Sequence, residues 1–140
     1  MFIEEKQLKE TFWNNYKKRK AIVRYQFENA MRTGNCDLLT LEVFQEKYQI
    51  NAFEFKLTDI KKVLAQAEAN LPFVNKSWIV VPINKENLIR DKYLNYLKEK
   101  RYIGVIGVED GGRWNIIYQP MIQQQFKVNQ EVLKFIVEGK

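Results

Sequence analysis

A short apolar run at residues 77–81 (Ser-Trp-Ile-Val-Val) constrains the fold of this chain most, because it follows a helical pattern and stops at Pro82. The preceding residues 60–71 place their apolar side chains at helical spacing, after Thr58 or Asp59 as N-cap. An apolar strand after a strand and a crossover helix is typical of a buried strand parallel to the earlier one. The sequence therefore predicts an α/β fold with parallel strands in its central sheet.

The rest of the chain supplies strands and helices on both sides of this unit. Branched and aromatic residues predict strands, and apolar spacing predicts helices. No linker or repeat interrupts the 140 residues, so we expect one domain spanning 1–140. The order is α-β-β-β-α-β and then α-β-β-α, a mixed central sheet with flanking helices. Besides the run at 77–81, the predicted strands are 21–27, 37–43, 49–57, 102–108 and 113–118, and the helices are 2–18, 60–71, 88–100 and 129–137.

The chain contains no histidine and a single cysteine, Cys36. This excludes Ser-His and Cys-His catalysis, nearly every zinc site and an intramolecular disulfide. Catalysis would have to use carboxylates, Lys, Tyr, Ser or Thr, with an oxygen-liganded cation such as Mg²⁺. We expect Cys36 to be a small buried residue, and Trp13, Trp78 and Trp114 to be core residues rather than platforms for stacked bases.

The formal net charge is +6 and the isoelectric point is near 9.3. A positive excess suits a polyanionic partner such as nucleic acid, although solubility is an equally good explanation. No apolar stretch approaches the roughly 20 residues of a membrane span. The first residues also lack the pattern of a secretory signal, so the sequence favours a cytoplasmic protein.

Glu54, Phe55 and Lys56 lie in the third predicted strand, where successive side chains point to opposite faces. Glu54 and Lys56 are therefore expected on one face and Phe55 on the other. A charged pair on a largely buried sheet needs a partner, because burying an unpaired charge is costly. The pair is either mutually compensated in a solvated ion pair or associated with a metal and a phosphate.

Asp37 begins the preceding strand. A loop of about four residues, 44–47, would set Val43 opposite Tyr48, and continuing this register sets Asp37 opposite Glu54. Directly opposed residues lie about 5 Å apart at Cβ, and two carboxylates at that distance repel unless a cation lies between them. Taken alone, Asp37 is better explained as a carboxylate at a strand start near a turn than as a metal ligand.

These residues together predict a metal site. Asp37, Glu54 and the main-chain carbonyl of Phe55 would hold Mg²⁺, which takes oxygen ligands and keeps several waters. The cation would activate a water and neutralise charge on a phosphate. Lys56 would orient the attacking hydroxide or stabilise the developing negative charge.

The segments 34–39 (Gly-Asn-Cys-Asp-Leu-Leu) and 53–57 (Phe-Glu-Phe-Lys-Leu), with the helix and strand that follow, resemble the PD-(D/E)xK nuclease superfamily. That superfamily includes restriction enzymes, junction resolvases and repair nucleases. The resemblance covers about residues 21–82 and implies a restriction-endonuclease-like αβββαβ core, to which a C-terminal hairpin and helix are added. Cys36 stands where many members have Pro or Arg before the first acidic residue.

The resemblance also implies roles for individual residues. Asp37 and Glu54 would be metal ligands, Lys56 the catalytic lysine, and Gln66 a glutamine near the catalytic face. Without the resemblance, Gln66 is better explained as a plain helix-surface residue. Glu10 corresponds only loosely to a first-helix glutamate that assists in some branches. The implied activity is hydrolysis of phosphodiester bonds in DNA with Mg²⁺ or Mn²⁺.

The basic run Lys17, Lys18, Arg19 and Lys20 is a candidate nucleic-acid contact, or else a solvated helix end. No separate target-recognition domain is evident, so specificity would come from loops, a homodimer or a partner protein. The main alternative is a catalytically inactive protein that keeps the fold as a nucleic-acid-binding or scaffold module. A nuclease acting on RNA is a further alternative.

Overall fold

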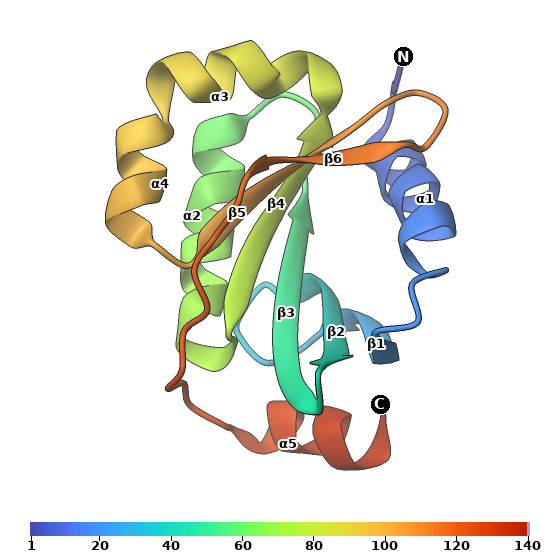
Figure 1. Cartoon of the computed structure of the whole chain (residues 1–140), viewed down its shortest axis with the longest axis vertical. Coiled ribbons are helices and arrows are strands. Elements are labelled where there is room, and N and C mark those ends of the chain that lie inside the picture. The colour runs from blue at the N-terminus through green and yellow to red at the C-terminus, as the bar shows by residue number, and fades with distance from the viewer. Residues whose placement is uncertain (140) are drawn as a thin grey trace.

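The computed structural model describes residues 1–139. Its centre is a six-stranded sheet in the order β1-β2-β3-β4-β5-β6 (Figure 1). The strands are β1 (Ile22–Asn29), β2 (Cys36–Phe44), β3 (Lys47–Phe55), β4 (Lys76–Pro82), β5 (Ile103–Val108) and β6 (Trp114–Tyr118). The α-helices are α1 (Glu5–Tyr16), α2 (Ile60–Asn70), α3 (Glu86–Lys92), α4 (Leu94–Lys100) and α5 (Gln130–Glu138), and the short 3₁₀ helices are η1 (Leu71–Phe73) and η2 (Ile83–Lys85).

The sheet is mixed. β1, β2 and β3 form an antiparallel meander, β4 and β5 run parallel to β3, and β6 returns antiparallel to β5. The predicted parallel strand is confirmed, since Glu54 of β3 pairs in register with Ile79 of β4 after the α2 crossover. The predicted order α-β-β-β-α-β and the α/β class with flanking helices are also confirmed.

Helices cover both faces of the sheet, as Figure 1 shows, with α1 on one side and α2, α3 and α4 on the other. Leu8, Phe12 and Tyr16 recur every four residues along α1 and so share its buried face. The Phe12 ring lies 5.8 Å from that of Phe53 and 5.7 Å from that of Phe55, measured between centroids. α1 therefore packs on the face that carries Phe53 and Phe55.

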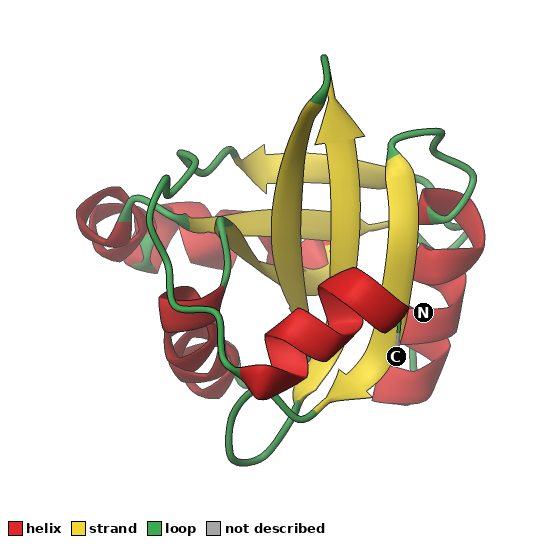
Figure 2. Cartoon of the chain, turned by 90° about the horizontal axis from the view of Figure 1, so that it is seen from below, coloured by secondary structure: helices red, strands yellow, loops and turns green. Residues whose placement is uncertain are grey.

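The opposite face carries two apolar clusters. One joins Val63 and Ala67 of α2 to Ile79 of β4 and Val105 of β5. The other places Phe135 and its α5 neighbours against the same face of β2 and β3. In Figure 2, α5 crosses in front of the strands. The sheet is thus covered by three packed groups of side chains.

The helix predicted for residues 88–100 is wrong as a single element. α3 ends at Lys92, and Tyr93 has φ −120° and ψ 3°, outside the helical region, before α4 begins at Leu94. Ile89 of α3 and Leu97 of α4 are both fully buried in the cluster beside α2. The chain thus forms two short helices that meet at Tyr93, and each places a residue in this cluster.

The turn between β2 and β3 is tighter than predicted. Phe44 pairs with Lys47, so only Gln45 and Glu46 form the turn, with φ of 49° and 68°. Two positive φ values in a two-residue hairpin define a type I′ turn, whose twist matches the strands. The four-residue loop was therefore wrong, although the predicted pairing of Val43 with Tyr48 is confirmed.

Replacing Glu46 with glycine is expected to stabilise the protein by roughly 0.5–1 kcal/mol, because glycine adopts positive φ without the steric cost borne by an L side chain. Urea denaturation of both proteins measures the change. Glu99→Gly is the matched control: Glu99 is exposed in α4, and glycine there should destabilise by about 1 kcal/mol. Equal destabilisation by both substitutions would contradict the assigned turn.

Within the part of the chain that the structure describes, no helix is both long enough and apolar enough to cross a membrane.

Candidate active site

Asp37 and Glu54 lie side by side where β2 begins and β3 ends. Leu38 pairs with Phe53, so the next pair along the ladder is Asp37 and Glu54. The backbone N–H of Asp37 donates a long hydrogen bond of 3.4 Å to Glu54 Oε2, and the N–H of Phe55 donates one of 2.9 Å to Asp37 Oδ2. The structure thus brings together the two carboxylates that the sequence singled out.

Glu54 is fully buried, and its two oxygens have different surroundings. Oε2 forms an ion pair with Arg32 Nη2 at 3.0 Å and accepts a hydrogen bond from Asn70 Nδ2 at 2.9 Å. Oε1 is buried without a hydrogen-bond partner among residues 1–139. A buried acceptor that lacks a donor is costly, and such atoms are concentrated at functional sites.

Burial raises the pKa of Glu54 to about 7, and the neighbouring Asp37 carboxylate adds to the rise. The hydrogen bond from Asn70 and the charge of Arg32 act in the opposite direction. The cost of ionising a carboxylate beside another carboxylate in a buried setting is therefore only partly offset. A pKa near neutrality in a position next to a cleft is a feature of functional sites.

Asp37 also faces an open cleft of about 360 Å³ between the strand ends and α1. Its walls include Phe55 together with Glu5 and Glu10 of α1. Glu10, only a loose candidate in the sequence, therefore lines the same cleft as Asp37. The cleft gives solvent and a ligand a path to the Asp37 carboxylate, whereas Glu54 lies behind it.

Lys56 does not share a face with Glu54, contrary to the sequence prediction. β3 ends at Phe55, and the Lys56 ammonium pairs with Glu5 Oε1 of α1 at 3.0 Å. Glu54 instead contacts Asn70 of α2, on the opposite side of the sheet. Strand alternation holds for Glu54 and Phe55 but stops where the strand stops. Lys56 therefore lies on the side of the sheet that α1 covers.

Gln66 stays outside the hydrogen-bond network of Glu54 in the described part of the chain. It is half-buried on α2, and Asn70, one turn further on, makes the contact instead. Asn70 and Arg32 are the site residues that sequence reasoning missed. An asparagine following Val63 and Ala67 on the apolar side of α2 was a usable signal, whereas Arg32, in a loop, offered none.

The basic run divides into two kinds of residue. Lys17, Lys18 and Lys20 are exposed, whereas Arg19 is half-buried and pairs with buried Glu42 at 2.8 Å.

Trp13 and Trp78 are buried, as predicted, but Trp114 is only half-buried. Cys36 is fully buried, as predicted, and burial raises the pKa of its thiol.

The donor set at Asp37 and Glu54 fits a hard cation only if solvent or substrate completes it. Within residues 1–139, no group of three or more Asp, Glu or Cys side chains is arranged to hold a metal ion. Mg²⁺ is commonly bound through one or two carboxylates plus waters and substrate phosphates. Asp37, Glu54 Oε1 and main-chain oxygen therefore suit Mg²⁺, and Glu54 Oε1 is the atom that would gain most.

The raised pKa of Glu54 should be visible in the pH dependence of the free energy of unfolding. Because its folded pKa of about 7 exceeds the ordinary 4.5, the stability it contributes is complete below pH 4.5 and is lost as pH rises through 7. Over this pH range we expect the free energy of unfolding of the wild type to fall by about 3 kcal/mol relative to that of Glu54→Gln. Urea denaturation at several pH values measures it, with Glu99→Gln as an exposed control. A constant difference between wild type and Glu54→Gln would contradict the raised pKa.

Comparisons with known proteins show the fold alone. No protein-family model matches this sequence, and no curated protein matches it. The structure is similar to the solved SPO1766 protein of unknown function from Silicibacter pomeroyi, with a TM-score of 0.63 and 14% sequence identity. The match covers 99% of this chain and 84% of that chain. The similarity supports the arrangement of the sheet and helices without assigning an activity.

Proposed function

We propose that this protein is a metal-dependent nuclease that hydrolyses phosphodiester bonds of DNA. The observation that carries the proposal is the adjacent pair Asp37 and Glu54 beside an open cleft, with Glu54 Oε1 buried and without a hydrogen-bond partner among residues 1–139. Two carboxylates so placed favour a cation between them. The resemblance to the PD-(D/E)xK superfamily, and with it a restriction-endonuclease-like core, is part of the same proposal.

Each residue of the proposed site would have a separate role in the reaction. Asp37, Glu54 and the Phe55 carbonyl would hold Mg²⁺ or Mn²⁺, which supplies an acidified water and neutralises phosphate charge. Lys56 would orient the attacking oxygen or stabilise charge on the phosphate. Its present partner Glu5 is 49% exposed, so the ion pair is weak and a phosphate can replace it. Glu10 and Gln66 remain assisting candidates.

The substrate and assembly belong to the same proposal. A net charge of +6 and the exposed Lys17, Lys18 and Lys20 suit a DNA backbone. One site cuts one strand, so a homodimer or a partner protein would complete a double-strand cut and supply specificity. A DNA substrate and the single free Cys36 both agree with a cytoplasmic protein.

One observation favours a catalytically inactive nucleic-acid-binding or scaffold protein as the second candidate. Arg32 already supplies a positive charge to Glu54, and its side chain is only 12% exposed. An internal cation of this kind compensates the carboxylate without a metal. In that case Asp37 and Glu54 would serve the fold alone.

The decisive experiment incubates the protein with supercoiled plasmid, single-stranded DNA, branched DNA and RNA. Each substrate is tested with Mg²⁺, with Mn²⁺ and with EDTA. Cleavage of DNA that requires a divalent cation supports the nuclease. Binding of DNA without cleavage under every condition supports the scaffold protein, and preferential cleavage of RNA would replace DNA as the substrate.

A further inference from the structure

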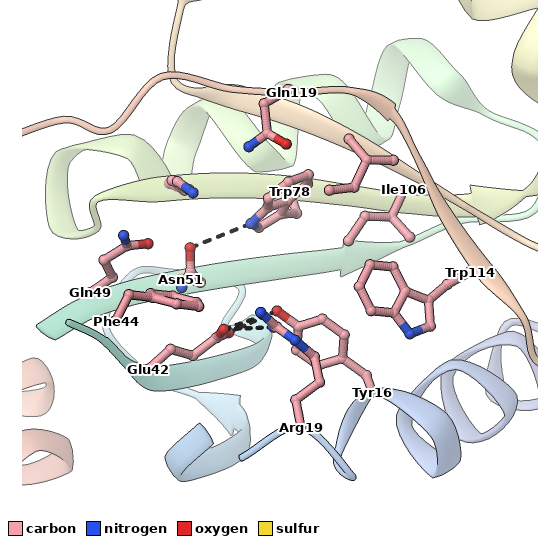
Figure 3. Close-up of a pocket in the computed structure, with 12 residues that line it drawn as sticks. Tyr16, Arg19, Glu42, Phe44, Gln49, Asn51, Trp78, Ile106, Trp114 and Gln119 are labelled. Atoms are coloured by element: carbon pink, nitrogen blue, oxygen red, sulfur yellow. Dashed lines mark hydrogen bonds and ion pairs between the residues drawn. The ribbon is translucent and has the colours of Figure 1, made fainter. Parts of the chain in front are cut away.

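A second polar site lies on the face of the sheet that α1 covers, at the opposite end of β2 from Asp37. It is a cavity of about 200 Å³ bounded by the end of α1 and by β2, β3, β4 and β6 (Figure 3). Glu42 lies five residues beyond Asp37, or about 16 Å along the strand. The cavity is therefore separate from the proposed metal site.

Four aromatic side chains contribute to the walls of the cavity. Tyr16, Phe44, Trp78 and Trp114 line it, and the Arg19 guanidinium lies among three of these rings (Figure 3). The guanidinium carbon is 4.6 Å from the centre of the Tyr16 ring, 5.6 Å from Phe44 and 5.8 Å from Trp114. Aromatic faces and a planar guanidinium are the surfaces on which nucleobases stack.

Glu42 fixes this arrangement. Its carboxylate accepts hydrogen bonds from the Tyr16 hydroxyl at 2.9 Å, Thr40 Oγ1 at 2.7 Å and Arg19 Nη1 at 2.8 Å. Both of its oxygens are engaged, and it is 1% exposed. Glu42 therefore positions Arg19 and Tyr16 and leaves no carboxylate oxygen directed to a ligand, so a cationic ligand is disfavoured.

The unused polar groups offer both a donor and an acceptor. Gln49 Oε1 is buried without a hydrogen-bond partner among residues 1–139. The Lys76 ammonium lies over the Trp78 ring at 5.9 Å and makes no hydrogen bond or ion pair with any described residue. Burial lowers the pKa of Lys76, although the charge of Glu42 opposes that effect. A simple anion would use Lys76 and leave Gln49 Oε1 unpartnered.

We propose that this cavity binds one unstacked nucleobase, held between aromatic walls and read by Gln49 and Lys76. A base edge presents donors and acceptors together, which matches the unused acceptor of Gln49 and the unused donors of Lys76. The net charge of Arg19, Lys76 and Glu42 is positive, and exposed Lys17, Lys18 and Lys20 flank Arg19 in the chain. These lysines suit the phosphate on the sugar of the same nucleotide.

The base comes from a free nucleotide or from a nucleotide within a strand, and NMR titration distinguishes the two sources. The indole N–H signals of Trp78 and Trp114 report on the cavity, and that of Trp13, which packs against Tyr25 and Phe27, is an internal reference. The four 5′-ribonucleotides and short single-stranded oligonucleotides are titrated in EDTA. Ribose 5-phosphate and inorganic phosphate test the phosphate alone.

We expect nucleotides to shift Trp78 and Trp114 while Trp13 stays unchanged. Lys76→Met and Gln49→Met should each raise the dissociation constant roughly tenfold, because each removes one hydrogen bond to the base. Lys62→Met, an exposed change on α2, is the control. Tighter binding of oligonucleotides than of mononucleotides identifies a strand as the source, and the reverse identifies a free nucleotide; both support a base pocket.

Several results would overturn the proposal. Absence of shifts at Trp78 and Trp114 with every nucleotide and oligonucleotide is one. Equal shifts with ribose 5-phosphate or phosphate would show an anion site instead. Unchanged affinity in folded Lys76→Met and Gln49→Met proteins would also contradict it. Base binding does not depend on the nuclease site, so Asp37→Ala should bind the base as the wild type does, whether or not it affects cleavage.

Discussion

Replacing Asp37 with alanine is expected to abolish DNA cleavage, with a loss of at least roughly 100-fold in rate. Asp37 provides the carboxylate that faces the cleft, and without it Glu54 alone would remain to hold the proposed cation. Lys56→Met should reduce the rate by a similar factor, because the positive charge beside the phosphate is lost. Rates are measured from nicking of supercoiled plasmid in Mg²⁺ and in Mn²⁺.

The matched controls are Asp91→Ala and Lys62→Met, which remove the same charges from exposed helix positions. Both should cleave at the wild-type rate. Persistent cleavage by Asp37→Ala and Lys56→Met at the control rate would show that these residues take no part in the reaction. Loss of cleavage in the control proteins would show that the cleavage rate depends on the overall charge of the protein and not on the positions of Asp37 and Lys56.

Replacing Arg32 with methionine should destabilise the protein by about 3–5 kcal/mol at pH 8, because it leaves a buried carboxylate without its cation. The change also removes the hydrogen bond from Arg32 Nε to Asn70. The loss should be smaller at pH 5. Without Arg32 the pKa of Glu54 rises further above its ordinary value, so Glu54 is protonated there and needs no cation. Urea denaturation at both pH values measures the difference.

Arg90→Met is the control, since Arg90 pairs with Glu86 on an exposed helix surface and should contribute less than about 1 kcal/mol. Adding Glu54→Gln to Arg32→Met should recover much of the lost stability at pH 8. Equal destabilisation by Arg32→Met at pH 5 and pH 8 would show that the effect comes from packing and not from the Glu54 charge.

The geometry around Asp37 and Glu54 was predictable because it depends on strand register. Pairing Val43 with Tyr48 fixes every later pair in the ladder, and a change in turn length that keeps this pair leaves Asp37 opposite Glu54. The alternation of Glu54 and Phe55 follows from the pleat in the same way. Strand register and side-chain alternation therefore sufficed to predict these contacts.

Contacts that depend on where an element ends, or on distant loops, were not predictable. Strand alternation gave the wrong side for Lys56, because β3 ends one residue earlier and the lysine turns to α1. Arg32 is 22 residues from Glu54 and reaches it through a loop. The second cavity likewise joins Tyr16 to Glu42 across 26 residues, and only the packing of α1 brings them together.

A metal site at Asp37 and Glu54 can be detected by titrating ¹⁵N-labelled protein with Mn²⁺, whose unpaired electrons broaden nearby amide signals. A cation held by Asp37 and Glu54 predicts that the amides of residues 37, 38, 54 and 55 broaden first, and that Asp37→Asn removes this effect. Broadening that begins elsewhere, such as at exposed Asp110, or that is unchanged in Asp37→Asn, would contradict a metal site at these carboxylates.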